Sequence, residues 1–218
     1  SDAKKGDVTD IRIVYMDQSV RNISLKHNHD ASKHQRPAAL IKNQLGILDK
    51  ELDKQYRDEL KIIYENFKSH VLTCDQENGV YLFKLVKARD PNLITNLYSD
   101  VCNLVKKYLL QHADDVAIGK YFKFLVGNTI FEKVSVYPKT RTIVIKDFNQ
   151  VNDATAVVDA YIHPNNGHLI VQFNNGFILN MRLHTASSRF SLNTALSLKF
   201  DSVVDMDNAP VPQRSISF

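Results

Sequence analysis

The chain has 218 residues, 44% of them hydrophobic and 24% charged, which is the ordinary composition of a globular protein with room for one core or two small domains. Lys and Arg outnumber Asp and Glu by 28 to 24, and this mild positive charge suits a polyanionic partner without requiring one. Apolar runs fall short of the roughly 20 residues that cross a membrane, and the polar N-terminus does not resemble a signal peptide. We therefore expect a soluble protein with no membrane partner.

Two cysteines, Cys74 and Cys102, form no CxxC pair and no disulfide framework. They indicate a reducing compartment, the cytoplasm, and exclude zinc held by cysteines. P-loop, GxGxxG and GxSxG motifs are also absent from the sequence, so we expect no nucleotide cofactor and no α/β-hydrolase chemistry.

The first 48 residues predict a β-hairpin followed by a basic segment. Apolar residues alternate on both sides of a polar turn at 17–21, at Ile11, Ile13 and Tyr15 and then at Val20, Ile23 and Leu25. Residues 27–42 are basic and rich in histidine. We expect this segment to follow the sheet on the surface, with Pro37 ending any short helix that begins near Asp30.

Residues 49–126 predict a layer of three helices. Apolar residues recur at three- and four-residue intervals over 49–71, which is typical of an amphipathic helix. The second helix begins at Asp90 and Pro91, an N-cap residue followed by proline at the first helical position, and runs to Leu109. The third runs from Asp114 to Leu125, and its acidic start suits a helix N-terminus.

Residues 127–218 predict a β-rich part. Strands are expected at 131–136, 142–148, 155–162, 168–173, 177–183 and 196–204, separated by turns such as HPNNGH and FNNGF. Residues 209–218 are expected to be a loose tail. The sequence thus predicts an α+β fold with a mixed β-sheet core flanked by helices, in segments 1–48, 49–126 and 127–218 that can form one continuous domain.

An acidic residue and a lysine mark the two ends of the predicted hairpin. Asp10 opens its first strand and Lys26 ends its second, so the two meet at one edge of the sheet. A carboxylate and a neighbouring main-chain carbonyl can bind Mg²⁺, and a lysine can activate the attacking water. Such a pair is also common in hairpins without any function, so the spacing alone does not establish a nuclease.

Two separated segments resemble one known family. The stretches GDVTDI and ISLKHNHDASKH, and later NMRLHTASSRFSLNTALSLKFD, resemble in the same order the PD-(D/E)xK nuclease core of type II restriction endonucleases similar to HaeIII. Residues 49–177 carry little that matches. The resemblance implies a restriction-endonuclease-like fold and a bacterial-type cytoplasmic enzyme.

By this resemblance Asp10, Ser24 and Lys26 are the catalytic positions. Asp10 and the main-chain carbonyl of Leu25 are the metal ligands, and Mg²⁺ is the cofactor. Thr9 stands where the general motif has proline, and Ser24 stands at its second acidic position. A hydroxyl is a poorer Mg²⁺ ligand than a carboxylate, so a further ligand is expected, either Asp7 or a residue of a preceding segment. We favour the preceding segment.

The DNA-binding positions fall into two groups. The first lies beside Lys26 and is His27, Asn28, His29, Lys33, His34 and Arg36; the second is Arg182, His184, Ser187, Ser188 and Arg189. Basic side chains neutralise phosphates, and arginine can make a bidentate contact to guanine. The adjacent letters HNH do not reproduce the site of an HNH nuclease, and the five-residue spacing of His29 and His34 does not indicate zinc.

The resemblance implies a site-specific endonuclease that cleaves double-stranded DNA, with a GGCC-type target, as part of a restriction-modification system. A palindromic target implies either a two-fold homodimer or a monomer that cuts each strand in turn. Three alternatives stay open: a structure-selective repair nuclease, a non-catalytic DNA-binding module, which the serine at position 24 favours, and a structural domain for protein interaction.

Overall fold

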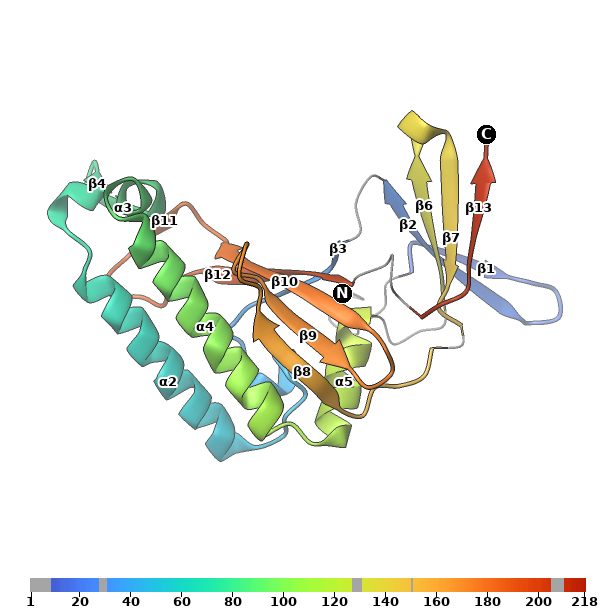
Figure 1. Ribbon diagram of the computed structural model, residues 1–218, viewed down its shortest axis with the longest axis horizontal. Coiled ribbons are helices and arrows are strands. Elements are labelled where there is room, and N and C mark those ends of the chain that lie inside the picture. The colour runs from blue at the N-terminus through green and yellow to red at the C-terminus, as the bar shows by residue number, and fades with distance from the viewer. Residues whose placement is uncertain (1–8, 28–30, 127–130, 150, 205–209) are drawn as a thin grey trace.

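The computed structural model describes residues 9–27, 31–126, 131–149, 151–204 and 210–218, with the backbone alone at 26, 27, 31–34, 203 and 204. Within these ranges the chain forms helices and three β-sheets (Figure 1). The α+β class predicted from the sequence is therefore confirmed.

The predicted hairpin belongs to a mixed sheet with the strand order β1-β2-β6-β7-β13. Its strands are β1 (Ile11–Val14), β2 (Val20–His27), β6 (Glu132–Tyr137), β7 (Thr142–Asp147) and β13 (Gln213–Ser217). β1 and β2 pair antiparallel, as predicted, whereas β2 and β6 run parallel. The loose tail predicted at 209–218 is wrong where β13 forms, because residues 213–217 pair with β7 along the edge of this sheet.

An antiparallel sheet with the order β3-β12-β10-β9-β8 lies next to the helices (Figure 1). Its strands are β3 (Ala31–Gln35), β12 (Leu198–Val204), β10 (Ile178–Thr185), β9 (Leu169–Phe173) and β8 (Val157–Ile162). The six strands predicted after Gly127 are all present. A short helix before Pro37, which the sequence left open, does not form at residues 31–35, because they pair with β12 as an edge strand.

The three predicted helices are confirmed as α2 (Lys50–Ser69), α4 (Pro91–Gln111) and α5 (Asp115–Val126). Asp49 caps α2 by accepting the N–H groups of Glu51 and Leu52 at 2.8 and 2.9 Å, and Asp90 caps α4 in the same way. The sequence patterns did not predict two shorter helices and a small sheet: α1 (Ile41–Gln44), α3 (Phe83–Arg89), and the sheet of β4 (Gln76–Glu77), β5 (Val80–Leu82) and β11 (Arg189–Phe190).

Buried aromatic rings hold the layers together. Tyr56 of α2 and Tyr108 of α4 meet edge to face, with ring centroids 5.0 Å apart. At the other end of the core, Phe177 lies 5.1 Å from Phe122 of α5 and 6.3 Å from Phe148. Phe148 in turn stacks on Phe131 at 4.7 Å. Because Phe131 and Phe148 flank β6 and β7, this chain of rings joins the mixed sheet to the core under the antiparallel sheet.

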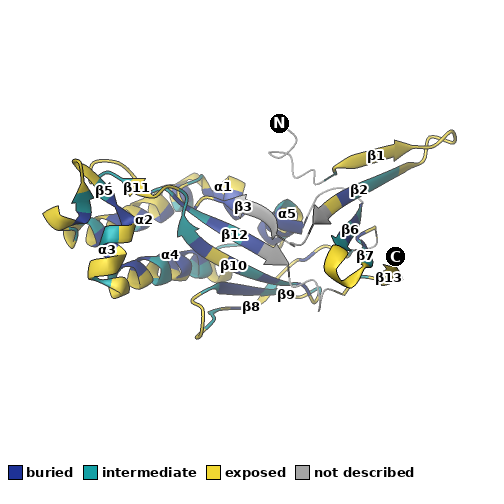
Figure 2. Cartoon of the chain, turned by 90° about the horizontal axis from the view of Figure 1, so that it is seen from above, coloured by how far each residue is buried: buried dark blue, intermediate teal, exposed yellow. Residues whose placement is uncertain are grey.

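The mixed sheet stands at the opposite end of the molecule from α2 and α4 (Figures 1 and 2). One of its faces carries polar side chains that are buried: Ser24, Lys133, Ser135 and Lys146. The other face carries apolar side chains, of which Ile11, Ile13, Leu25 and Ile216 are exposed, together with the ion pair of Arg21 and Glu132. This distribution reverses the usual one, in which the apolar face of a sheet is buried and the polar face meets water.

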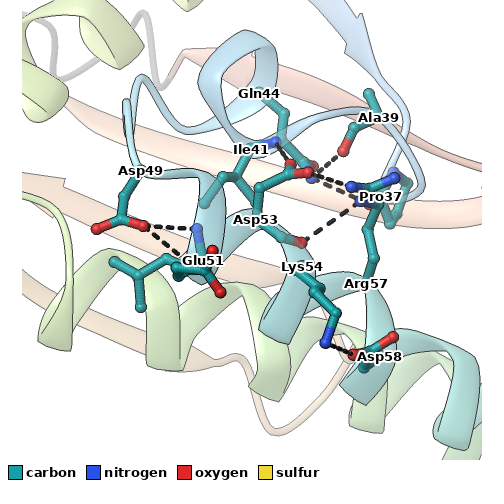
Figure 3. A network of polar contacts seen from close by, with 11 residues as sticks. Pro37, Ala39, Ile41, Gln44, Asp49, Glu51, Asp53, Lys54, Arg57 and Asp58 are labelled. Atoms are coloured by element: carbon teal, nitrogen blue, oxygen red, sulfur yellow. Dashed lines mark hydrogen bonds and ion pairs between the residues drawn. The ribbon is translucent and has the colours of Figure 1, made fainter.

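A polar network fixes the chain between β3 and α2 (Figure 3). The buried amide of Gln44 donates to the carbonyls of Pro37 and Ala39, both at 3.0 Å. Asp53 of α2 accepts the N–H of Ile41 at 2.8 Å and pairs with Arg57 at 2.6 Å. The basic segment that follows the hairpin is therefore anchored on α2.

Replacing Asp53 by alanine is expected to lower the free energy of unfolding by about 2 kcal/mol, because a buried N–H group loses its acceptor. Asp58→Ala on the same helix is the matched control. Asp58 pairs with Lys54 at 3.5 Å on the surface, and exposed pairs contribute less than about 1 kcal/mol. Urea unfolding of both variants measures the difference; equal losses would contradict an anchoring role of Asp53.

The hydrogen bonds of Asp75 should make the free energy of unfolding depend on pH. This buried carboxylate ends the 3₁₀ turn η2 (Thr73–Asp75) and accepts two hydrogen bonds from Arg89, at 2.8 and 3.0 Å. These bonds lower its pKa below the ordinary value of 3.8. Its contribution to stability is therefore complete above the unfolded-state pKa and is lost as the pH falls through the lower folded-state pKa.

The free energy of unfolding of Asp75→Asn should thus differ most from that of the unchanged protein near pH 7, and the difference should shrink below about pH 4. Urea titrations between pH 2 and pH 7 measure it. A difference that stays constant over the whole range would show that Asp75 stabilises the fold without its charge.

Candidate active site

The carboxylate of Asp10 joins the two strands of the hairpin. Asp10 directly precedes β1, its side chain is exposed, and its N–H donates to the carbonyl of Ile23 at 2.9 Å. Its Oδ2 atom accepts the N–H of Leu25 at 2.7 Å and the hydroxyl of Ser24 at 3.2 Å. The structure therefore brings together three of the positions singled out in the sequence, Asp10, Ser24 and Leu25.

The main-chain carbonyl of Leu25 lies on the same side of β2 as Asp10. In an extended strand the N–H and C=O of one residue point to the same edge, and the Leu25 N–H points to the Asp10 carboxylate. Lys26 follows within β2, where it pairs with Ser135 of β6; its side chain lies outside the part of the chain that the structure describes.

Two lysines that the sequence did not point to continue the site across the sheet. Ser24 pairs with Lys133 of β6, and Lys133 pairs with Lys146 of β7. Directly paired residues point to the same face of a sheet. The alternation in EKVSVY could have shown that Lys133 and Ser135 share a face, but nothing in it tells which face is buried.

The ligands around Asp10 fit a hydrated Mg²⁺ ion. Magnesium is usually bound through one or two carboxylates, substrate phosphates and several waters, and the exposed Asp10 carboxylate and the Leu25 carbonyl can fill two such positions. Ser24 instead donates its hydroxyl to Asp10. Among the described residues, no group of three or more His, Cys, Asp or Glu side chains could hold a metal. A metal here would need further oxygen ligands, such as water or a phosphate group.

A second polar cluster lies on the antiparallel sheet and contains two of the predicted DNA-binding residues. Asp201 of β12 accepts from Arg182 of β10 at 2.9 Å, and its Oδ2 lies 2.7 Å from Nε2 of His184. Lys199 lies 3.8 Å from the same carboxylate. Asp201 also pairs along the backbone with His34 of β3. Asp201, which the sequence did not point to, thus orients Arg182 and His184.

Four of the other predicted DNA-binding positions are described with their side chains, and all four are exposed. Ser187, Ser188 and Arg189 are exposed between β10 and the start of β11, and Arg36 is exposed after β3. His27 belongs to β2, and Lys33 and His34 belong to β3, but their side chains lie outside the described part; Asn28 and His29 lie outside it altogether.

The thiol of Cys102 is not a candidate nucleophile. Cys74 and Cys102 are both free, and burial raises the pKa of the Cys102 thiol to about 12, so this thiol stays protonated. The helices of the described ranges are all too short or too polar to cross a membrane. Comparisons with family models, curated proteins and solved structures found no match to this chain.

Replacing Asp10 by alanine should expose the Leu25 amide, because the acceptor of its hydrogen bond is lost. We expect faster hydrogen exchange at Leu25 in Asp10→Ala and near-normal exchange in Asp10→Asn, which keeps a carbonyl oxygen at this place. Asp17→Ala, in the turn of the same hairpin, is the control and should leave the Leu25 amide unchanged. Equal protection in all variants would contradict the contact.

Proposed function

We propose that this protein is a Mg²⁺-dependent endonuclease that hydrolyses phosphodiester bonds of double-stranded DNA at a specific site, like the type II restriction endonucleases that its motifs resemble. The observation that carries the proposal is the contact of the Asp10 carboxylate with Ser24 and Leu25. The sequence motif names these positions for catalysis and metal binding, and the fold brings them together although 14 residues separate Asp10 from Ser24.

Each group around Asp10 has a role in this chemistry. Asp10 and the Leu25 carbonyl would hold the metal, and the Ser24 hydroxyl would keep the carboxylate oriented. A bound Mg²⁺ would supply charge stabilisation at the phosphate and lower the pKa of a coordinated water. Lys26 would orient the attacking water and accept or share its proton.

Specific recognition is assigned to the cluster on the antiparallel sheet and to the basic segment. Arg182 and His184 are oriented by Asp201, and an oriented arginine suits bidentate contact with a guanine. Arg36 and Arg189 are exposed and suit contacts with phosphates. A GGCC-type target follows from the resemblance, and such a palindrome can be cut by a homodimer or by a monomer acting twice.

One observation favours a second function, a DNA-binding module without catalysis. Ser24 stands where the nuclease motif has its second acidic residue, and it is only 2% exposed. Of the two carboxylates of the motif, this chain therefore has only the one of Asp10. A protein of this kind would bind duplex DNA through its basic residues and leave it uncut.

Digestion of a plasmid of known sequence tests the proposal. With Mg²⁺ we expect discrete fragments, which disappear with EDTA and return with excess Mg²⁺. Asp10→Ala and Lys26→Ala should each lower the cleavage rate by at least about 100-fold, since each loses a group that acts on the reacting phosphate or water. Asp17→Ala and Lys139→Ala, which remove the same side chains from exposed turns, should cleave normally.

The products separate the alternatives. Cleavage without fixed sites would indicate a structure-selective nuclease. DNA that is shifted on a gel but never cut would contradict the catalytic role and support the binding module. Cleavage that survives both substitutions would remove Asp10 and Lys26 from the active site.

A further inference from the structure

A cavity of about 580 Å³ lies between one face of α2 and the segment 192–195, which follows β11. Its volume falls within the range of about 300 to 1,000 Å³ that is usual for small-molecule sites. Neither Asp10 nor Asp201 lines it. The cavity is therefore separate from the candidate active site and from the cluster on the antiparallel sheet.

One face of α2 forms the first wall of the cavity. Arg57, Lys61, Tyr64 and Lys68 line it at intervals of four, three and four residues, which places them on the same side of the helix. The apolar side chain of Leu60 lines it as well. This wall thus combines positive charge with apolar surface.

The opposite wall is held in place at both ends. Phe190, which precedes it, lies 5.7 Å from Phe67 of α2 between ring centroids, and Leu196, which follows it, is buried. Within the turn the hydroxyl of Ser191 accepts the N–H of Asn193 at 3.1 Å. Because these contacts exist without a ligand, binding requires little ordering of the protein, which favours affinity.

Lys68 links the two walls. Its Nζ donates to the main-chain carbonyl of Thr194 at 2.7 Å. Within the described part of the chain this neutral carbonyl is its only hydrogen-bond partner, and no carboxylate forms an ion pair with it. Burial lowers the pKa of Lys68, although the charge of Glu65 acts in the opposite direction. An anion in the cavity would therefore find an ammonium group that is already oriented and not yet paired.

The other charges of the cavity largely compensate one another. Arg57 pairs with Asp53 at 2.6 Å (Figure 3), and Lys61 pairs with Glu65 at 3.7 Å. The charge of Lys68 is left over, so this part of the surface carries one net positive charge. A single phosphate or carboxylate group complements it.

We propose that this cavity binds a small molecule that carries a phosphate or carboxylate group on an apolar body. The anionic group lies at Lys68, and the apolar body lies against Leu60 and Leu192, which line the two walls. This inference does not depend on the proposed nuclease function, because it uses none of the residues assigned to cleavage or to DNA recognition.

Calorimetric titration of the full chain with phenyl phosphate and with phenylacetate tests the site. Each probe joins one anionic group to an apolar ring, and the comparison of the two shows which anion the site prefers. We expect saturable binding of at least one probe. Inorganic phosphate, which lacks the ring, and benzyl alcohol, which lacks the charge, should both bind more weakly.

Lys68→Met should weaken binding of the preferred probe by at least about tenfold, because a hydrogen bond to a charged group is lost. Lys68→Arg should keep most of the binding, since it keeps the charge. Lys84→Met is the matched control: Lys84 is exposed on α3, pairs with Glu77 at 3.3 Å and does not line the cavity, so its replacement should leave binding unchanged.

Leu192→Ser tests the apolar part of the site separately. It should weaken binding of the ring-bearing probe and leave the affinity for inorganic phosphate unchanged. Thermal unfolding of every variant accompanies the titrations, and if Lys68→Met fails to fold, Leu192→Ser and Lys68→Arg decide the question.

Absence of binding by both ring-bearing probes would overturn the proposal. Equal affinity of folded Lys68→Met and the unchanged protein would overturn it as well, and so would inorganic phosphate that binds as tightly as phenyl phosphate. Cleavage of plasmid DNA should be the same in Lys68→Met as in the unchanged protein, so failure of this site and failure of the nuclease proposal are distinguished.

Discussion

The parallel pairing of β2 with β6 determines how the candidate site is built. Parallel strands cannot be joined by a tight turn and need a long crossover. Here the crossover runs over residues 28–131, so it contains β3 and all five helices of the described chain. The helical half of the molecule is thus the connection that brings Lys133 beside Ser24. A hairpin between β2 and its neighbour would have placed other residues there.

The reversed faces of the mixed sheet are the clearest departure from ordinary folding rules. Buried polar groups and exposed apolar groups carry information because stability alone does not select them. Ser24, Lys133, Ser135 and Lys146 lie on the buried face, whereas isoleucines of β1 and β13 lie on the exposed one. The aromatic contacts of Phe131 and Phe148 supply the apolar packing that the inner face lacks.

Local patterns predicted most of the elements, because those elements carry their own signals. Asp90 caps its helix as predicted, the periodic segment that begins at Asp49 is a helix, and the alternating strands after Gly127 are all found. β3 and β13 were missed, because ASKHQ and QRSIS have no apolar alternation and become strands only by pairing with β12 and β7. The partner strand of β2 and the buried face of the sheet depend on distant residues. The contact of Asp10 with Ser24 and Leu25 was predictable from the hairpin, but the lysines beside it were not.

The long crossover also determines the order in which the parts of the mixed sheet are synthesised and can pair. The hairpin leaves the ribosome well before its neighbour β6, because β2 ends at His27 and β6 begins at Glu132, more than one hundred residues later. Contacts between such distant segments form late, after the local helices. A partly made chain therefore has Asp10 and Ser24 without Lys133 and Lys146. The paired positions Ser24, Lys133 and Lys146 come together only once the core is in place.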